Sequence, residues 1–147
     1  MRAVVTRVSE ASVEIDGKIR GKIGKGFLVL LGIAPGDTEK EAIHIADKIC
    51  GARIFSDEND KMNLNLKAVD GELLVVSQFT LYADLKSRRP GFSKAAKPDI
   101  ANPLYEKVMD ECKSRGFNVE HGEFGADMKV ASINDGPVTL IFDTDEI

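Results

Sequence analysis

The stretch from Leu73 to Asp84, LLVVSQFTLYAD, constrains the fold more than any other part of the sequence. Its first half is apolar and partly β-branched, which is typical of a strand that is buried on both faces. The polar residues Ser77, Gln78 and Thr80 follow directly. Side chains of this kind often only bond to neighbouring backbone groups. At the end of a buried strand, however, clustered hydroxyl and amide groups can equally form a polar site that is held rigidly.

Strand patterns recur on both sides of this stretch. Residues 16–17, Asp-Gly, predict a tight hairpin turn near the start of the chain. Alternating or continuous apolar patterns predict strands over residues 2–8, 11–15, 18–24, 26–34, 52–55, 117–121, 126–133 and 138–143.

Two helices are predicted between these strands. The first begins at Thr38, where Glu41 completes a capping box, and ends at Gly51. The second begins at residues 102–103, Asn-Pro, and ends at Gly116. Many strands with two separated helices predict an α+β fold, in which both helices pack outside an antiparallel, strongly curved sheet.

Length and composition place the chain among ordinary globular proteins. The 147 residues are expected to form a single domain, residues 1–147, with a proper buried core. Hydrophobic residues make up 43% and charged residues 30%, as in a soluble protein. No apolar run approaches the ~18 residues of a membrane span, and the N-terminus lacks a signal-peptide core. No membrane partner is therefore expected, and a cytoplasmic location is predicted.

Neither a metal nor a cofactor is predicted. Cys50 and Cys112 lie in the two predicted helices and are expected to be buried free thiols. No CxxC motif or Cys/His cluster indicates zinc. The acidic segment 56–65, SDENDKMNLN, suggests calcium, but it lacks the EF-hand spacing and the closing glutamate, so a solvated loop is the better interpretation.

The segment 85–98, LKSRRPGFSKAAKP, concentrates positive charge in a chain whose net charge is −4. It contains no acid and has no helical or strand periodicity. A binding interpretation makes it a track for phosphates, with Phe92 available to stack on a base. A solvated loop with scattered charges is an equally good interpretation of the segment alone. Its cations are Lys86, Arg88, Arg89, Lys94 and Lys97.

The segment 134–139, NDGPVT, lies between two predicted strands. Asn-Asp-Gly is ordinary turn chemistry, so a simple hairpin turn is one interpretation. Pro137, however, would begin the returning strand, where it has no N–H to donate to the ladder. The Gly136–Pro137 peptide bond is also one of the few kinds that can be cis. These features favour a specialised turn.

A conventional nucleophilic triad is not predicted. A serine or threonine nucleophile needs a base, usually histidine. The chain has only His44, on a helix, and His121, near a strand end, and neither has an evident acidic partner. Residues 77–80 instead offer hydroxyl, amide and backbone N–H donors, which are the components of an oxyanion hole. Such a site suits an activated acyl ester better than a stable peptide.

With these segments in view, the sequence resembles the D-aminoacyl-tRNA deacylase family. SQFTLY at 77–82 and NDGPVT at 134–139 match the two signature motifs of that family. The segments MRAVVTRVSEASV at 1–13, RRPGF at 88–92 and FGADM at 124–128 match as well. The resemblance therefore covers essentially the whole chain, and the two motifs occur in the expected order.

The resemblance implies a homodimer with a β-barrel-like sheet and helices outside it. It implies hydrolysis of the ester that joins a D-amino acid, or glycine mischarged on tRNA-Ala, to the terminal adenosine of tRNA, without a metal or cofactor. L-aminoacyl-tRNA would be rejected, and a ribose hydroxyl of the tRNA would assist the attacking water. Chirality proofreading in translation is the expected role.

The resemblance also implies roles for particular residues. The ester site would be lined by Ser77, Gln78, Phe79 and Thr80. A chiral gate supplied by the partner subunit would consist of Gly136 and Pro137, and Arg7 and Met128 would support that gate. Within the basic segment, tRNA contacts are expected from Lys86, Arg88 and Arg89.

One other class of function competes with the enzyme interpretation. A nucleic-acid-binding module could use the basic segment 85–98 without any chemistry, for example in DNA replication. Selective release of a D-amino acid from tRNA favours the enzyme, whereas tight binding without turnover favours the module.

Overall fold

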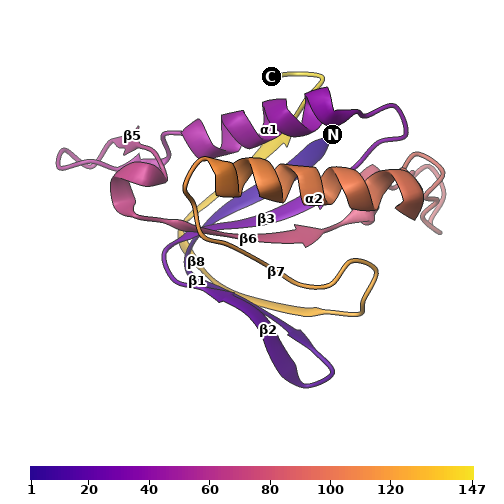
Figure 1. Ribbon diagram of the computed structural model, residues 1–147, viewed down its shortest axis with the longest axis horizontal. Helices are drawn as coiled ribbons and strands as arrows, with labels where there is room; N and C mark the ends of the chain where they lie inside the picture. The colour runs from indigo at the N-terminus through magenta and orange to yellow at the C-terminus, as the bar shows by residue number, and fades with distance from the viewer.

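A 14-residue strand, β1 (Arg2–Ile15), runs through the middle of the sheet in a computed structural model that describes residues 1–147 (Figure 1). Along one edge of β1, its first half pairs with β3 (Gly26–Gly32) and its second half with β2 (Lys18–Ile23). Along the other edge it pairs with β8 (Lys129–Asp143). All three pairings are antiparallel. The segments 2–8 and 11–15 are thus one strand that passes from one partner to the next.

The sheet continues from β3 to β6 (Glu72–Ser77) and then to β7 (Val119–His121), and both of these pairings are parallel. The α+β class with a strongly curved sheet is confirmed, but the expectation of a purely antiparallel sheet is wrong for this half. The reason lies in the connections. Parallel neighbours need a long crossover, and each crossover here contains a helix, α1 (Glu39–Gly51) or α2 (Pro98–Ser114).

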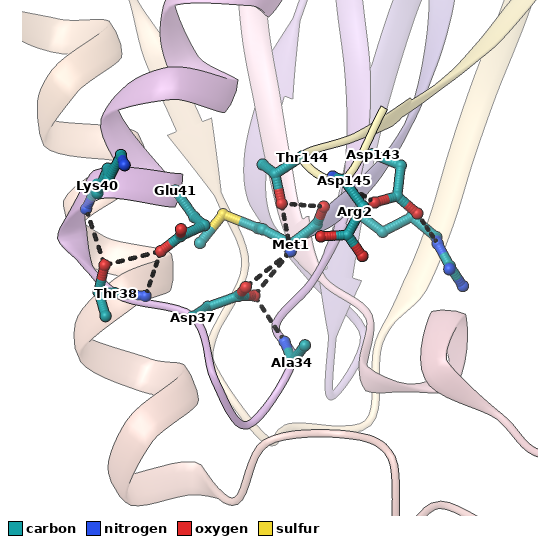
Figure 2. A network of polar contacts seen from close by, with 10 residues as sticks. All are labelled: Met1, Arg2, Ala34, Asp37, Thr38, Lys40, Glu41, Asp143, Thr144 and Asp145. Atoms are coloured by element: carbon teal, nitrogen blue, oxygen red, sulfur yellow. Dashed lines mark hydrogen bonds and ion pairs between the residues drawn. The ribbon is translucent and has the colours of Figure 1, made fainter. Parts of the chain in front are cut away.

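The two helices lie side by side over one face of the sheet, as predicted (Figure 1). The stripe of Ala42, Ile45, Ala46 and Ile49 on α1 is fully buried. At its N-terminus, the Thr38 N–H donates to Glu41 Oε2 at 2.7 Å, so the predicted capping box is confirmed (Figure 2). The buried residues of both helices belong to one apolar core with those of β3 and β6, among them Val29, Leu31 and Val75.

Helix α2 begins four residues earlier than predicted. Pro98 occupies its first turn, and the N–H groups of Ile100 and Ala101 donate to the carbonyl of Lys97. Lys97-Pro98 matches Asn102-Pro103 in placing proline at the first helical position, where the N–H has no intrahelical partner, and Pro103 itself lies inside the helix. The consequence is that the N-terminal end of α2 comes close to the end of β6.

The strands at the two ends of the sheet order, β2 and β7, approach each other at Gly21. A Cβ on this residue of β2 would lie 2.7 Å from the carbonyl oxygen of His121 in β7. Only glycine allows two backbones this close. The sheet is consequently a nearly closed barrel, which limits the length of its exposed edges.

The remaining segments are short. The acidic segment 56–65 forms a small hairpin, β4 (Phe55–Ser56) with β5 (Met62–Leu64). Its Asp57 carboxylate accepts backbone N–H groups of Asn59 and Lys61, so it shapes the turn. A 3₁₀ turn, η1 (Lys67–Val69), leads into β6. Neither α1 nor α2 has the length and apolarity needed to cross a membrane.

The two cysteines are buried free thiols, as predicted. Cys50 of α1 and Cys112 of α2 face each other with their Sγ atoms 3.6 Å apart. The hydrogen bond with the Cys50 thiol, together with burial, raises the pKa of Cys112. Both side chains pack in the seam between the helices, remote from the polar end of β6.

Candidate functional site

The buried strand β6 ends at Ser77, and the chain turns at once into a 3₁₀ turn, η2 (Phe79–Tyr82). Gln78 N–H makes the last strand-like bond, to the Leu31 carbonyl at 2.7 Å. Within the turn, Leu81 N–H donates to Gln78 O at 3.2 Å. The first N–H groups of a helical turn have no partner inside it. The N–H groups of Phe79 and Thr80 are therefore free of partners within the turn.

Strand β6 is held in place by a tyrosine of α2. Tyr105 is buried, and its hydroxyl donates to the Val75 carbonyl at 2.8 Å. Burial raises the pKa of Tyr105 to about 12, so the hydroxyl keeps its proton and remains a donor at neutral pH. The strand that carries Ser77 is thus fixed two residues before its polar end.

The polar side chains at the end of β6 are close to one another. Gln78 Nε2 donates to Thr80 Oγ1. Ser77 and Gln78 are half-buried, whereas Phe79 and Thr80 are exposed. The structure therefore places all four predicted ester-site residues together at the surface.

A cavity of about 540 Å³ opens beside this turn, a size typical of small-ligand sites. Its walls are mainly apolar, and its one charged lining residue is Lys97, at the start of α2. Phe79 and Phe92 meet edge to face, with ring centroids 5.0 Å apart. Chemically distinctive residues of the lining are Ser77, Gln78, Phe79, Phe92, Phe124 and Met128.

Phe124 was not singled out from the sequence. It lies in the loop between β7 and β8, and its ring is 6.0 Å from that of Tyr105. The only sequence signal for it was its place in the segment FGADM at 124–128. Phe124 lies in a loop without helical or strand periodicity, so the sequence does not show what its side chain faces. It lines the cavity because the loop folds back over the sheet.

The segment 134–139 is not a hairpin turn. β8 is one continuous strand that bulges outward: Thr139 pairs with Thr6 and Asn134 with Val8, so four residues, 135–138, lie opposite the single residue Arg7. Bulges of this kind leave the extra residues unpaired and bend the strand. Within the bulge, Gly136 has φ +124°, and the Gly136–Pro137 peptide bond is cis.

Arg7 supports this bulge from β1. It is only 9% exposed, its Nε donates to Asp135 O at 3.1 Å, and its Nη1 donates to Ile54 O at 2.7 Å. A weaker ion pair joins it to the Asp135 carboxylate at 3.6 Å. A Cβ on Gly136 would lie 2.8 Å from Arg7 Nη2, so the guanidinium packs directly beneath the bulge.

The predicted residues thus fall into two groups in one copy of the chain. Met128 lies with Ser77, Gln78 and Phe79 in the cavity. Gly136 and Pro137 do not line that cavity, and Arg7, in β1, contacts the bulge that carries them.

The basic segment forms a loop at the mouth of the cavity. Asp84 and Gly91 close it through two backbone hydrogen bonds of 2.7 and 2.9 Å. Lys94 pairs with the Asp84 carboxylate at 3.5 Å, and the Lys86 N–H is the main cause of the lowered pKa of Asp84. The side chains of the other cations near the loop tip, Lys86, Arg88 and Arg89, are exposed and form no ion pair. In Figure 1 this loop lies beside the N-terminal end of α2.

Neither histidine is hydrogen-bonded to the polar end of β6. His44 Nε2 is hydrogen-bonded to the carbonyl of Ile147 at 2.9 Å. His121 Nδ1 contacts the carbonyl of its neighbour Gly122. No hydrogen bond joins either ring to Ser77 or Thr80, so the arrangement offers donors for an oxyanion but no activated hydroxyl nucleophile.

Known proteins match this chain over nearly its whole length. A family model described as D-Tyr-tRNA(Tyr) deacylase matches residues 4–143. A D-aminoacyl-tRNA deacylase of Thermosipho africanus is 53% identical, covering 100% of this chain and 99% of that protein. One from Colwellia psychrerythraea is 55% identical, covering 95% of this chain and 97% of that protein.

Solved structures show the same fold. The c-Myc DNA Unwinding Element Binding Protein superposes with a TM-score of 0.92 at 40% identity, over 97% of this chain and 98% of that chain. A probable eukaryotic D-amino acid tRNA deacylase superposes with a TM-score of 0.83, over 96% of this chain and 97% of that chain. Its identity is 16%, so this second likeness concerns the fold alone.

Proposed function

The chain belongs to the D-Tyr-tRNA(Tyr) deacylase family, and on that premise we propose that its cavity and the η2 turn hydrolyse the ester of D-aminoacyl-tRNA. The products are the free D-amino acid and tRNA, so the protein is a hydrolase of carboxylic esters. The observation that carries the assignment of the site is the η2 turn itself: its first N–H groups, on Phe79 and Thr80, have no partner within the turn, and Phe79 lines the cavity.

The proposed chemistry needs little beyond these donors. Water attacks the ester carbonyl carbon, and negative charge develops on the carbonyl oxygen. The two N–H groups and the Thr80 hydroxyl donate to that oxygen, which stabilises the transition state. The ester C–O bond then breaks, and the ribose oxygen takes a proton. Because neither histidine is hydrogen-bonded to Ser77 or Thr80, we propose that a ribose hydroxyl of the tRNA assists the water.

Chirality is selected by the Gly136–Pro137 bulge of a partner subunit. The bulge excludes any side chain that points towards it from the α-carbon, whereas a D side chain points to solvent. A site that selects in this way accepts many different D-amino acids, because it has no pocket shaped for one particular side chain. Glycine has no side chain to exclude, so glycyl-tRNA is also a substrate, and L-aminoacyl-tRNA is rejected.

A site built from residues of two subunits requires a homodimer. Strand β8 offers a surface through which two copies can associate. Its outer edge is unpaired in one copy, and along the strand the apolar side chains of Val130, Ile133, Leu140 and Ile141 are exposed. An unpaired strand edge presents free backbone N–H and C=O groups with which another chain can pair. In one copy, moreover, the bulge does not line the cavity.

We therefore expect light scattering to give a mass near twice 16.0 kDa. Ile141→Lys should yield monomers and remove most of the activity, since Ile141 is 70% exposed on this edge. Ile19→Lys, at another exposed isoleucine on β2, is the control and should leave the dimer intact. A monomeric protein with full activity would rule out the shared site.

The basic loop is proposed to contact the tRNA backbone. Neutralising Lys86, Arg88 and Arg89 together with glutamine should raise KM for tRNA. It should also flatten the plot of log K against log salt by roughly 2 to 3 units, because each phosphate contact contributes about 0.7 to 0.9. Lys94→Gln is the control in the same loop, since the charge of Lys94 is already paired with Asp84. An unchanged slope would place the tRNA elsewhere.

The function itself is tested by incubating the protein with D- and L-tyrosyl-tRNA and measuring free tyrosine. Selective release of D-tyrosine is expected, and glycyl-tRNA should be hydrolysed as well. We propose that the protein acts in the cytoplasm and that its role there is chirality proofreading in translation.

A second candidate is a nucleic-acid-binding module without chemistry. It is favoured by the 40% identity to a protein whose name describes binding to a DNA unwinding element. Tight binding of nucleic acid with no release of D-tyrosine would support this candidate over the deacylase.

A further inference from the structure

Arg2, the first residue of β1, reaches across the end of the sheet to the η2 turn. Its Nη1 donates to the carbonyl of Leu81 at 2.8 Å. Its guanidinium carbon also lies 4.7 Å from the centre of the Tyr82 ring, within the range of a cation–π contact. One side chain thus contacts two consecutive residues at the C-terminal end of the turn.

The orientation of Arg2 is itself fixed. Arg2 Nε donates to Asp143 Oδ2 at 2.9 Å, and Asp143, at the end of β8, is 8% exposed (Figure 2). Asp143 Oδ1 accepts the Asp145 N–H at 3.0 Å, which orients the carboxylate. The planar fork of arginine bonds in two directions with a defined angle between them, which a lysine ammonium does not do. The guanidinium therefore links the end of β8 to the turn.

This link completes the support of the turn. At its start, Gln78 N–H is bonded to Leu31 O of β3. At its end, Leu81 O is bonded to Arg2. Phe79 and Thr80, whose N–H groups are the proposed oxyanion donors, lie between these two fixed points. Without Arg2 the hydrogen bond at this second point is lost, so we expect the turn that carries the two N–H groups to be held less tightly, although it still packs against Gly32 of β3.

We propose that Arg2 is a positioning residue, which holds the η2 turn so that the N–H groups of Phe79 and Thr80 meet the developing oxyanion. This rests on the proposed deacylase function. Arg2, Leu81 and Tyr82 do not line the cavity, and the hydrogen bonds and ion pair of Arg2 are made to Asp143 and Leu81, not to the basic loop. Its loss should affect the chemical step and not tRNA binding, because donor placement matters in the transition state.

The test compares Arg2→Met, Arg2→Lys and Arg53→Met, each assayed well below its melting temperature. Arg53 is the matched control, since its Nε also donates to a backbone carbonyl, that of Asn63 at 2.9 Å, in the β4–β5 hairpin away from the site. Arg2→Met should lower kcat for D-tyrosyl-tRNA about tenfold at unchanged KM, because small misplacements of reacting groups are costly. Arg2→Lys should recover part of the loss, and Arg53→Met should match the parent.

Amide hydrogen exchange supplies a readout that does not depend on activity. In Arg2→Met, exchange should quicken in the peptide spanning residues 78–83 and stay unchanged in the peptide spanning α2. Parental kcat, or a change confined to KM, would overturn the proposal, as would unaltered exchange at 78–83. If the parent releases no D-tyrosine, the deacylase function fails, while the exchange result still decides whether Arg2 holds the turn.

Discussion

Replacing Gly136 by alanine is expected to lower kcat/KM for D-tyrosyl-tRNA by at least about a hundredfold, because displacing a positioning group by about 1 Å can cost this much. Gly136 has φ +124°, a region that residues with a Cβ rarely adopt. The new Cβ would also lie 2.8 Å from Arg7 Nη2 and 2.9 Å from Val138 Cγ2. The bulge must therefore move, and the bond from Arg7 to Asp135 O moves with it.

The matched control is Gly36→Ala. A Cβ on Gly36 would meet nothing within 4 Å, so this variant should keep parental activity and melting temperature. Both proteins should be assayed with D- and L-tyrosyl-tRNA, since a displaced gate either blocks the site or admits the L substrate. Parental rates and parental D over L selectivity in Gly136→Ala would show that the bulge has no part in selection.

Replacing Thr80 by alanine is expected to reduce kcat by about 10²–10³, the usual cost of removing one oxyanion donor, yet to leave measurable activity. Thr80 Oγ1 is bonded to Gln78, and no base is hydrogen-bonded to it. The backbone N–H groups of Phe79 and Thr80 remain in the variant. Thr80 is therefore expected to act as a donor and not as a covalent nucleophile.

Thr80→Ser is the control for the hydroxyl. It keeps the donor and loses only a methyl group, so its kcat should lie close to the parental value. Mass spectrometry of the quenched parent enzyme should find no aminoacyl group on Thr80. Complete loss of activity in Thr80→Ala, together with an aminoacyl adduct on the parent, would establish nucleophilic catalysis instead.

The site combines a rigid support with an open surface. Val75 is held by Tyr105 from α2, and Gln78 is held by Leu31 from β3, so the end of β6 has little freedom. Phe79 and Thr80 are nonetheless exposed. Preorganised donors of this kind need not reorient as charge develops in the transition state.

The sequence by itself determined those features whose signals lie within a few neighbouring residues. The capping box at Thr38 and Glu41 fixed the start of α1. The turn at Asp16-Gly17, where φ is +52° and +78°, fixed the hairpin between β1 and β2. The change from LLVV to SQFT marked the end of β6 and the polar cluster beyond it. Each of these features depends on the conformational preferences of a few neighbouring residues, and a short sequence motif is enough to specify it.

Only the tertiary structure decided which distant segments meet. The continuous apolar run of β6 is typical of strands in parallel sheets, but it does not identify the neighbouring strands, so the parallel pairs with β3 and β7 were not predicted. The bulge of β8 depends on its pairing with β1, and Arg2 meets Leu81 across 79 positions of sequence. Such contacts form because burial of the whole core selects one arrangement of strands and helices, and no local motif records that choice.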